Sequence, residues 1–294
     1  MKKILAMLLA LVMVLSLAAC ASTQPAAEPA ASSDAPAESG KTYTVGVCQL
    51  VQHEALDAAT QGFVDALKEA LGDAVTIDVQ NASGDSINCG TIVNGFVAKG
   101  VDLIMANATP ALTAAVSATA DIPILGTSIT AYGVALDIDD FSGTVGGNVS
   151  GTSDLADLQK QAQMILDWFP ETKTVGLLFC SAEPNSRYQI DEVRKALEAQ
   201  GVTCEEFAFT DSNDVSSVAQ KAADFSDVVY IPTDNTAASN TEAIANVLIP
   251  AGVPAICGEE GLCRGCGVAT LSISYYDLGV TTGKMAAKIL KGEA

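Results

Sequence analysis

Residues 147–154 read GNVSGTSD and lie near the middle of the chain, between two halves that repeat one pattern. Each half holds three short runs rich in Val and Ile and bounded by turn residues, which is typical of buried parallel strands. The runs begin at Thr44, Asp102 and Ile122, and their counterparts follow 130, 125 and 131 residues later. Two such halves joined by a polar segment predict an α/β protein of two Rossmann-like lobes with a central cleft. One large doubly wound sheet is the alternative.

The first forty residues predict export and a tether. Two lysines precede an apolar run that ends in LAAC at residues 17–20, which indicates a signal peptide over residues 1–19. This ending resembles the bacterial lipobox, in which the cysteine becomes a lipidated N-terminus; an ordinary secretory signal is the alternative. Residues 20–40 are mainly Ala, Ser, Pro and Glu, a composition that predicts a disordered tether. We therefore expect a lipoprotein that is anchored through Cys20 to the outer face of the bacterial cytoplasmic membrane.

Charge and cysteine content narrow the possible partners. The net charge of −20 argues against a nucleic-acid partner, because an acidic surface repels phosphates. Seven cysteines remain besides Cys20, and an odd number argues against a complete disulfide framework. Cys263 and Cys266 form a C-x-x-C, but the only histidine, His53, is far away in sequence. Free thiols are the favoured interpretation, and a local disulfide or a metal site are the alternatives.

The expected lobes divide the chain unevenly. We expect lobe 1 to comprise residues 41–135 plus 268–294, and lobe 2 to comprise residues 145–267. Residues 269–273 are predicted to form a strand that returns to lobe 1, and a helix is predicted to follow over residues 275–290.

Local signals in the second half predict further features. Ser153 is placed to cap a helix over residues 154–168, at whose end the only tryptophan, Trp168, is expected to pack in the core. Residues 255–267 are rich in glycine and cysteine and are predicted to form a loop.

Polar residues follow the predicted strands in both halves, where open α/β sheets bind ligands. Thr109 is placed to cap a helix whose first turn contains Pro110, and the free N–H groups of such a helix start favour an anion. Ordinary capping is the alternative for each residue taken alone. The candidate ligand-binding residues are Gln49, His53, Asn107, Thr109, Thr127, Ser128, Thr152, Asp154, Asn185, Ser186, Asp234, Asn235 and Tyr275.

Motifs for catalysis are missing from the sequence. With one histidine, a nucleophile–histidine site would have to use His53, and no serine lies in a G-x-S-x-G elbow. Residues 279–284 imitate a phosphate-binding loop but are one residue short. The sequence predicts no catalytic residues, no metal and no cofactor, and a degenerate hydrolase is a remote alternative.

Six stretches carry a resemblance that covers most of residues 43–290. The sequence resembles the substrate-binding proteins of ABC transporters, of the tryptophan/tyrosine type. The matching stretches are residues 49–57, 107–112, 148–154, 181–186, 232–239 and 258–279. The chain departs from the family at Gln52-His53-Glu54, where Glu-His-Pro is usual, and at residues 129–132. The family usually continues beyond Ala294, so we expect this chain to be a fragment or to be less stable than an extended version.

The resemblance implies a type I periplasmic-binding-protein-like fold that closes about a hinge. It also implies a monomer that captures a small solute, an amino acid and possibly an aromatic one, and delivers it to an ABC permease and its ATPase. A receptor for a membrane signalling sensor and a sugar- or nucleoside-binding protein are the alternatives.

An amino acid is a zwitterion, so a closed cleft must supply partners for both of its charges. Thr109, Thr127 and Ser128 are the candidates for its carboxylate. Asp234 is the first candidate for its ammonium, because it occupies the repeat position related to the Asn107–Thr109 loop. The alternatives for the ammonium are Asp154, Asn185 and Asn235.

Overall fold

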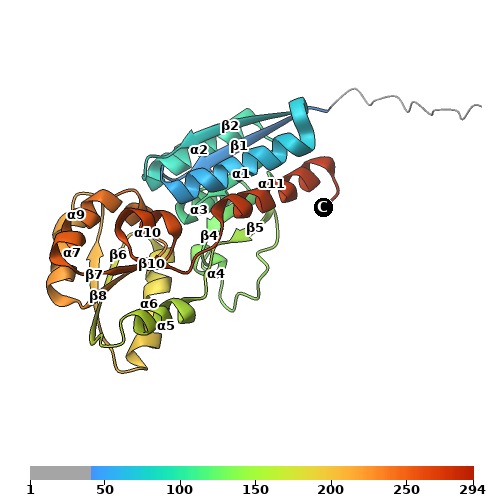
Figure 1. Ribbon diagram of the computed structural model, residues 1–294. Coiled ribbons are helices and arrows are strands. Elements are labelled where there is room, and N and C mark those ends of the chain that lie inside the picture. Colours follow the sequence, from blue (N-terminus) through green and yellow to red (C-terminus); the bar gives the residue numbers. More distant parts are fainter. Residues whose placement is uncertain (1–40) are drawn as a thin grey trace, which may run out of the picture. The chain divides into compact units, whose positions relative to one another are not determined.

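A computed structural model describes residues 41–294, which form two five-stranded parallel sheets, each with a helical layer on both faces (Figure 1). The prediction of two α/β lobes is confirmed. The predicted signal peptide, residues 1–19, and the predicted lipidated tether, residues 20–40, lie outside the described residues. Within the described part, no helix is both long and apolar enough to span a bilayer.

The first sheet has the strand order β2-β1-β3-β4-β5. Its elements are, in chain order, β1 (Tyr43–Gln49), α1 (Glu54–Leu71), the 3-10 turn η1 (Gly72–Ala74), β2 (Val75–Asn81), α2 (Ser86–Lys99), β3 (Leu103–Asn107), α3 (Thr109–Ala118), β4 (Ile124–Ile129), α4 (Tyr132–Ala135) and β5 (Val149–Ser153). Strand β3 shows why its apolar run is continuous: Leu103 and Met105 pack on one face of the sheet, and Ile104 packs on the other.

The second sheet has the order β10-β9-β8-β6-β7. Its elements are α5 (Leu158–Trp168), β6 (Thr174–Cys180), α6 (Pro184–Glu198), β7 (Thr203–Phe209), α7 (Val215–Phe225), β8 (Val228–Ile231), α8 (Asn235–Ala238), α9 (Thr241–Ala251), β9 (Ala255–Cys257), α10 (Glu260–Cys266) and β10 (Ala269–Thr270). The last helix, α11 (Tyr275–Lys291), returns to the first lobe and runs beside α1 (Figure 1).

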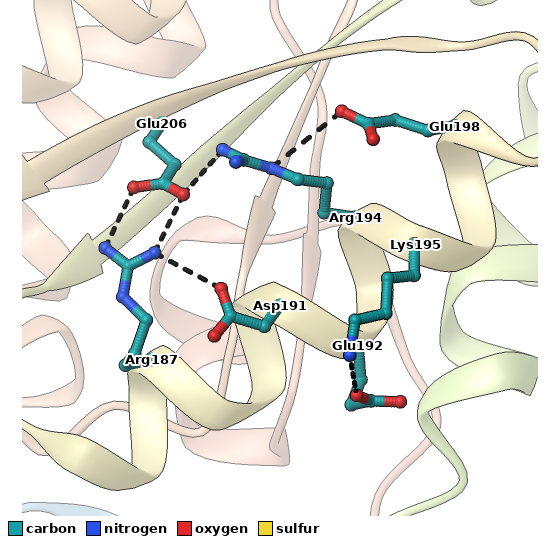
Figure 2. Close-up of polar contacts among 7 residues, drawn as sticks. All are labelled: Arg187, Asp191, Glu192, Arg194, Lys195, Glu198 and Glu206. Carbon is teal, nitrogen blue, oxygen red and sulfur yellow. Dashed lines mark hydrogen bonds and ion pairs between the residues drawn. The ribbon is translucent and has the colours of Figure 1, made fainter.

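An ion-pair network ties α6 to β7 (Figure 2). Arg187 donates to both carboxylate oxygens of Glu206, over 2.7 and 2.8 Å, and Arg194 donates to the same carboxylate over 2.6 Å. These two arginines hold the pKa of the Glu206 carboxyl below its usual value. Exposed pairs contribute little individually, but a bidentate contact is more specific in its geometry, and here it joins the first turn of α6 to β7.

Two expectations about sheet membership are corrected. Residues 149–153, placed beforehand in lobe 2, form the edge strand β5 of the first sheet and pair with β4. Backbone pairing at a sheet edge needs no apolar run, so the polar sequence concealed this strand. Residues 269–270 do not return to lobe 1 but pair with β9 in the second sheet. The return is made by α11, which buries its small residues against α1.

Several local expectations are also wrong. Thr109 is the first residue of α3, and Ala108, which has no side-chain cap, precedes it. Ser153 belongs to β5, and the cap of α5 is Asp157, which accepts a hydrogen bond from the Lys160 backbone N–H over 3.1 Å. Trp168 is 58% exposed rather than buried. Which residue caps a helix depends on where the preceding strand ends, and a short polar stretch of sequence does not predict that position.

The region expected to be a loop, residues 255–267, is also more regular than predicted, because it contains β9 and α10. All seven cysteines of the described chain are free thiols.

Candidate functional site

The carboxyl ends of four strands meet along one edge of the first sheet. Gln49 on β1 is in register with Asn107 on β3, which is in register with Thr127 on β4. Strand β5 lies next to β4, and Asp154 follows its last residue. The sheet therefore gathers the predicted first-lobe residues on one edge, as parallel strands do.

Five of the predicted residues have a buried side-chain atom without a hydrogen-bond partner. These atoms are His53 Nδ1, Asn107 Oδ1, Ser128 Oγ, Asp154 Oδ1 and Asn185 Oδ1. They lie at or after the carboxyl ends of strands in both lobes, whereas only four other buried side-chain atoms of the described residues have no partner. An unpaired buried polar atom costs about 1–3 kcal/mol, so its repeated occurrence at strand ends indicates a site that a polar ligand completes.

The other predicted residues are mostly engaged within the protein. The Gln49 amide donates to Asp57 over 2.6 Å and accepts from Thr60 over 2.6 Å, which fixes the loop after β1. Thr152 Oγ1 lies 3.3 Å from Thr127 Oγ1, and Thr282 of α11 lies within hydrogen-bond distance of both hydroxyls. Ser186 accepts from Asn185, and Thr109 is buried without a capping role.

Asp234, the first candidate for the ammonium, is a poor one. Its Oδ1 accepts from the Ala237 backbone N–H over 2.8 Å and its Oδ2 accepts from that of Cys180 over 2.7 Å. Burial and the neighbouring Glu183 carboxylate raise its pKa to about 7. The geometry favours the alternative of helix capping: Asp234 joins α8 to the end of β6.

Comparison of the buried carboxylates singles out Asp154. Among residues 41–294 the buried acids are Asp154, Glu183, Asp234 and Glu259. Glu183 and Glu259 use both oxygens to accept from backbone N–H groups at helix starts. Asp234 accepts from one such group and from the Cys180 N–H at the end of β6. Asp154 instead accepts from the Tyr275 hydroxyl over 2.8 Å at Oδ2, and its Oδ1 has no partner. Burial raises the pKa of Asp154, because a charge without a cation is costly in the interior.

A hydrogen-bonded chain crosses from one lobe to the other. His53 Nε2 lies 3.2 Å from Asn235 Oδ1, and Asn235 Nδ2 donates to Glu183 Oε2 over 2.6 Å. Because the carboxylate can only accept, the Asn235 oxygen must face His53, so Nε2 carries the proton. In the neutral ring Nδ1 is then an unpaired acceptor. Burial lowers the pKa of His53, against the opposing influence of Asn235, Glu183 and Asp57.

Backbone strain accompanies the same strand ends. Ala108, after β3, has φ 89° and ψ 158°, and Ser128 near the end of β4 has φ 56°. Side chains other than glycine rarely adopt these angles, and such strain persists where the surrounding structure imposes it, often at binding sites. Both residues lie at the carboxyl edge of the sheet, and sequence reasoning did not predict their positive φ angles.

Cavities open at the interface between the lobes. One of about 400 Å³ is lined by Val51, Asp85 and Pro110 from the first lobe and by Glu183 and Asn235 from the second, among others. The volume suits a small metabolite. The atoms left unpaired at Asn107, Ser128, Asp154 and Asn185 do not line it and are buried from solvent.

At the rim of the interface the lobes are bridged by an ion pair. Arg264 of α10 lies 2.6 Å from the Glu54 carboxylate at the start of α1.

Glu183 is a site residue that the sequence prediction missed. It is 5% exposed and its carboxylate oxygens accept from Asn185, Asn235 and Thr236. Its position in the sequence, between β6 and Pro184, could have identified it as a candidate. An acidic residue at that point was a candidate cap for α6, but the structure uses it to cap α8 instead.

Comparison with known proteins identifies the family. The family model of the ABC transporter substrate binding protein matches residues 44–294. The chain belongs to this family. The resemblance noted in the sequence is therefore confirmed. Proteins of the ABC substrate-binding family are solute-binding proteins rather than enzymes, and they act outside the cytoplasm.

A curated relative of this ABC substrate-binding protein is the tyrosine-binding protein of Clostridioides difficile. It is 32% identical over 300 residues, which cover 100% of this chain and 85% of the relative. A solved structure from Streptococcus pneumoniae, an ABC domain in complex with L-Trp, is 34% identical with a TM-score of 0.82 and covers 85% of each chain.

A third similarity bears on the lobe arrangement. The ligand-free, open structure of a Clostridium difficile substrate binding protein with adhesive properties is 35% identical and covers 86% of each chain, yet its TM-score is 0.62. Identity and coverage nearly equal those of the L-Trp complex, so the lower score reflects conformation. The lobes of this ABC substrate-binding protein lie closer to the arrangement of the L-Trp complex.

Proposed function

We propose that this protein captures an amino acid between its lobes and delivers it to the permease of an ABC importer. One observation carries the choice of solute. Asp154 is a buried carboxylate with a free oxygen, and no lysine, arginine or histidine of the described residues lies within 4.0 Å of it. An ammonium group of the solute supplies the missing cation.

The remaining unpaired atoms complete a zwitterion site. Ser128 offers a hydroxyl and a strained backbone position, and α3 begins after Ala108 with free N–H groups, which suit the solute carboxylate. His53, Asn107 and Asn185 contribute further unpaired atoms. The tyrosine-binding relative and the L-Trp complex support an aromatic side chain on the solute.

The test compares an amino acid with its analogue that lacks the amine. Wild type and Asp154→Asn are titrated calorimetrically at pH 7 with L-tyrosine, L-tryptophan and 3-(4-hydroxyphenyl)propionate. Removing the partner of a buried charge costs about 2–5 kcal/mol, so the variant should bind the best amino acid roughly 30-fold or more weakly. The deaminated analogue should bind wild type weakly and be insensitive to the substitution. Equal amino-acid affinities for the two proteins would remove Asp154 from the site.

The remaining parts of the proposal concern location and partners. We propose that Cys20 is lipidated and anchors a monomer to the membrane, supported by the LAAC sequence at residues 17–20 and by family membership. Several acyl chains on that cysteine would be needed for stable attachment. Expression in a bacterial host should place wild type in the membrane fraction and Cys20→Ser in the exported soluble fraction; identical fractionation would exclude the anchor.

A further inference from the structure

Two chain segments connect the lobes within the described residues. The first, residues 154–157, runs from β5 in the first sheet to α5, and the second, residues 271–274, runs from β10 in the second sheet to α11. Asp154 begins the first segment and Tyr275 follows the second. The hydrogen bond from the Tyr275 hydroxyl to Asp154 Oδ2 therefore joins residues 121 positions apart at the hinge.

Polar contacts hold the two segments together on both sides of this bond. In the first lobe, Thr152 and Thr282 share a hydrogen bond of 2.8 Å between their hydroxyls. In the second lobe, the Gln161 amide donates to the Leu271 carbonyl over 2.9 Å. Tyr275 is 6% exposed and Asp154 is 4% exposed, so both partners of the central bond are buried.

We propose that Tyr275 is a positioning residue: its hydroxyl keeps the Asp154 carboxylate ionised and oriented so that the free Oδ1 receives the solute ammonium. A hydrogen bond donated to a buried carboxylate favours its charged form. The Tyr275 hydroxyl engages Oδ2 and leaves Oδ1 as the carboxylate oxygen without a partner. The inference rests on the proposed function and deepens it by naming the residue that maintains the binding charge.

Among the groups around Asp154, Tyr275 is the one that most lowers the pKa of its carboxyl against the effect of burial. The titratable groups that face Asp154 are the Tyr132 and Tyr275 hydroxyls, and Glu259 acts on Tyr275 from the second lobe. None of these groups is cationic. Burial raises the pKa of Asp154, and hydrogen bonding by Tyr275 first and Thr130 second lowers it, so loss of the Tyr275 hydroxyl leaves the desolvation cost less opposed.

The test measures the charge on Asp154 directly, without a solute. The protein, from Gly40 onward or full length, is labelled at the aspartate carboxyl carbons, the Asp154 signal is assigned by its absence in Asp154→Asn, and its titration is followed by NMR. In Tyr275→Phe the midpoint should rise by about 1–2 pH units, because a bond to a charged group is lost. Affinity for L-tyrosine or L-tryptophan should fall about tenfold or more at pH 7, and the loss of binding in acid should begin at higher pH.

Tyr132→Phe is the matched control. Its hydroxyl is also buried near Asp154 but donates to the backbone carbonyls of Gly126 and Thr152, each over 3.1 Å. Its removal should lower stability without moving the Asp154 titration. An unchanged midpoint in Tyr275→Phe, or an equal rise in Tyr132→Phe, overturns the inference. If the midpoint rises only in Tyr275→Phe but wild type binds no amino acid, the proposed function fails while the positioning of the charge by Tyr275 is supported.

Discussion

At the scale of single residues, a few buried polar atoms have no hydrogen-bond partner, although similar groups elsewhere in the molecule are paired. Glu183, Asp234 and Glu259 show that this chain readily pairs a buried carboxylate with the N–H groups of a helix start. Asp154 is left out of that arrangement, and a buried carboxylate oxygen without a partner carries a desolvation cost. A site that binds a charged group incurs this cost until the solute arrives.

The free-energy cost of burying the charged Asp154 carboxylate predicts how the stability of the protein responds to Asp154→Asn. Burial raises the pKa of Asp154, so the folded protein binds this proton more readily than the unfolded chain does. The contribution of Asp154 to the stability of wild type is therefore greatest at low pH, and it is lost as pH rises through the raised pKa. The empty variant, which cannot ionise, should gain stability over wild type as pH rises, by roughly 1–3 kcal/mol at pH 8.

Urea unfolding at pH 4.5 and pH 8 measures this gain. Asp157→Asn is the control, because Lys160 holds the pKa of the exposed Asp157 below its usual value and its contribution to stability has the opposite pH dependence. A gain for Asp154→Asn that shrinks with pH would show that the Asp154 charge is compensated in the empty protein.

At the scale of elements, the pairing of α1 with α11 fixes the second connection between the lobes. Gly62 of α1 faces the Tyr276 carbonyl, and Gly279 of α11 faces the Ala59 carbonyl, with no room for a side-chain carbon at either position. Backbone contact at glycine sets how α11 lies on the first lobe. It thereby sets where Tyr275, the first residue of α11, meets the hinge.

Gly279→Ala should therefore destabilise the fold, by about 1–3 kcal/mol or more, because the new methyl group collides with backbone that cannot rotate away. Gly95→Ala in α2 is the matched control: no atom lies within 4 Å of its added carbon, so it should gain up to about 1 kcal/mol of helix propensity. Denaturant midpoints of the two variants measure both effects. Equal and small changes would mean that α11 shifts without cost.

At the scale of the whole molecule, closure brings together groups that belong to different lobes. The His53–Asn235 hydrogen bond and the Glu54–Arg264 ion pair both span the interface. The ion pair is largely exposed, at 49% and 63% for the two side chains, so it contributes little. The histidine contact is partly buried, and closure places the ring where its charged form is disfavoured.

Closure should therefore weaken in acid through His53. In an open form the pKa of the ring returns to its ordinary value near 6.5. Below that pH, protonation of His53 therefore stabilises the open form relative to the closed form. Between pH 6.5 and pH 5.5 the affinity of wild type for L-tyrosine or L-tryptophan should fall by up to about tenfold more than that of His53→Gln. Glutamine keeps an N–H donor for Asn235 but cannot ionise. Calorimetric titration across this range decides the point, and parallel pH profiles would exclude His53 as the sensor.

The sequence by itself determined the class of the fold, and it predicts the sheet edge on which the site lies. Continuous apolar strands buried on both faces leave a readable signal, and the 125- to 131-residue repeat revealed two similar lobes. All five residues with unpaired atoms were among the predicted candidates, because parallel strands bring their carboxyl ends to one edge of each sheet.

Only the tertiary structure decided which candidate carboxylate keeps an oxygen without a hydrogen-bond partner. Asp234 and Asp154 are both aspartates after strands, and nothing local distinguishes them. Two backbone N–H groups, one of them from the end of β6, occupy Asp234, whereas Asp154 meets one hydroxyl from α11. Such pairing depends on contacts between segments 54 and 121 residues apart, and local patterns of propensity and periodicity carry no information about those contacts.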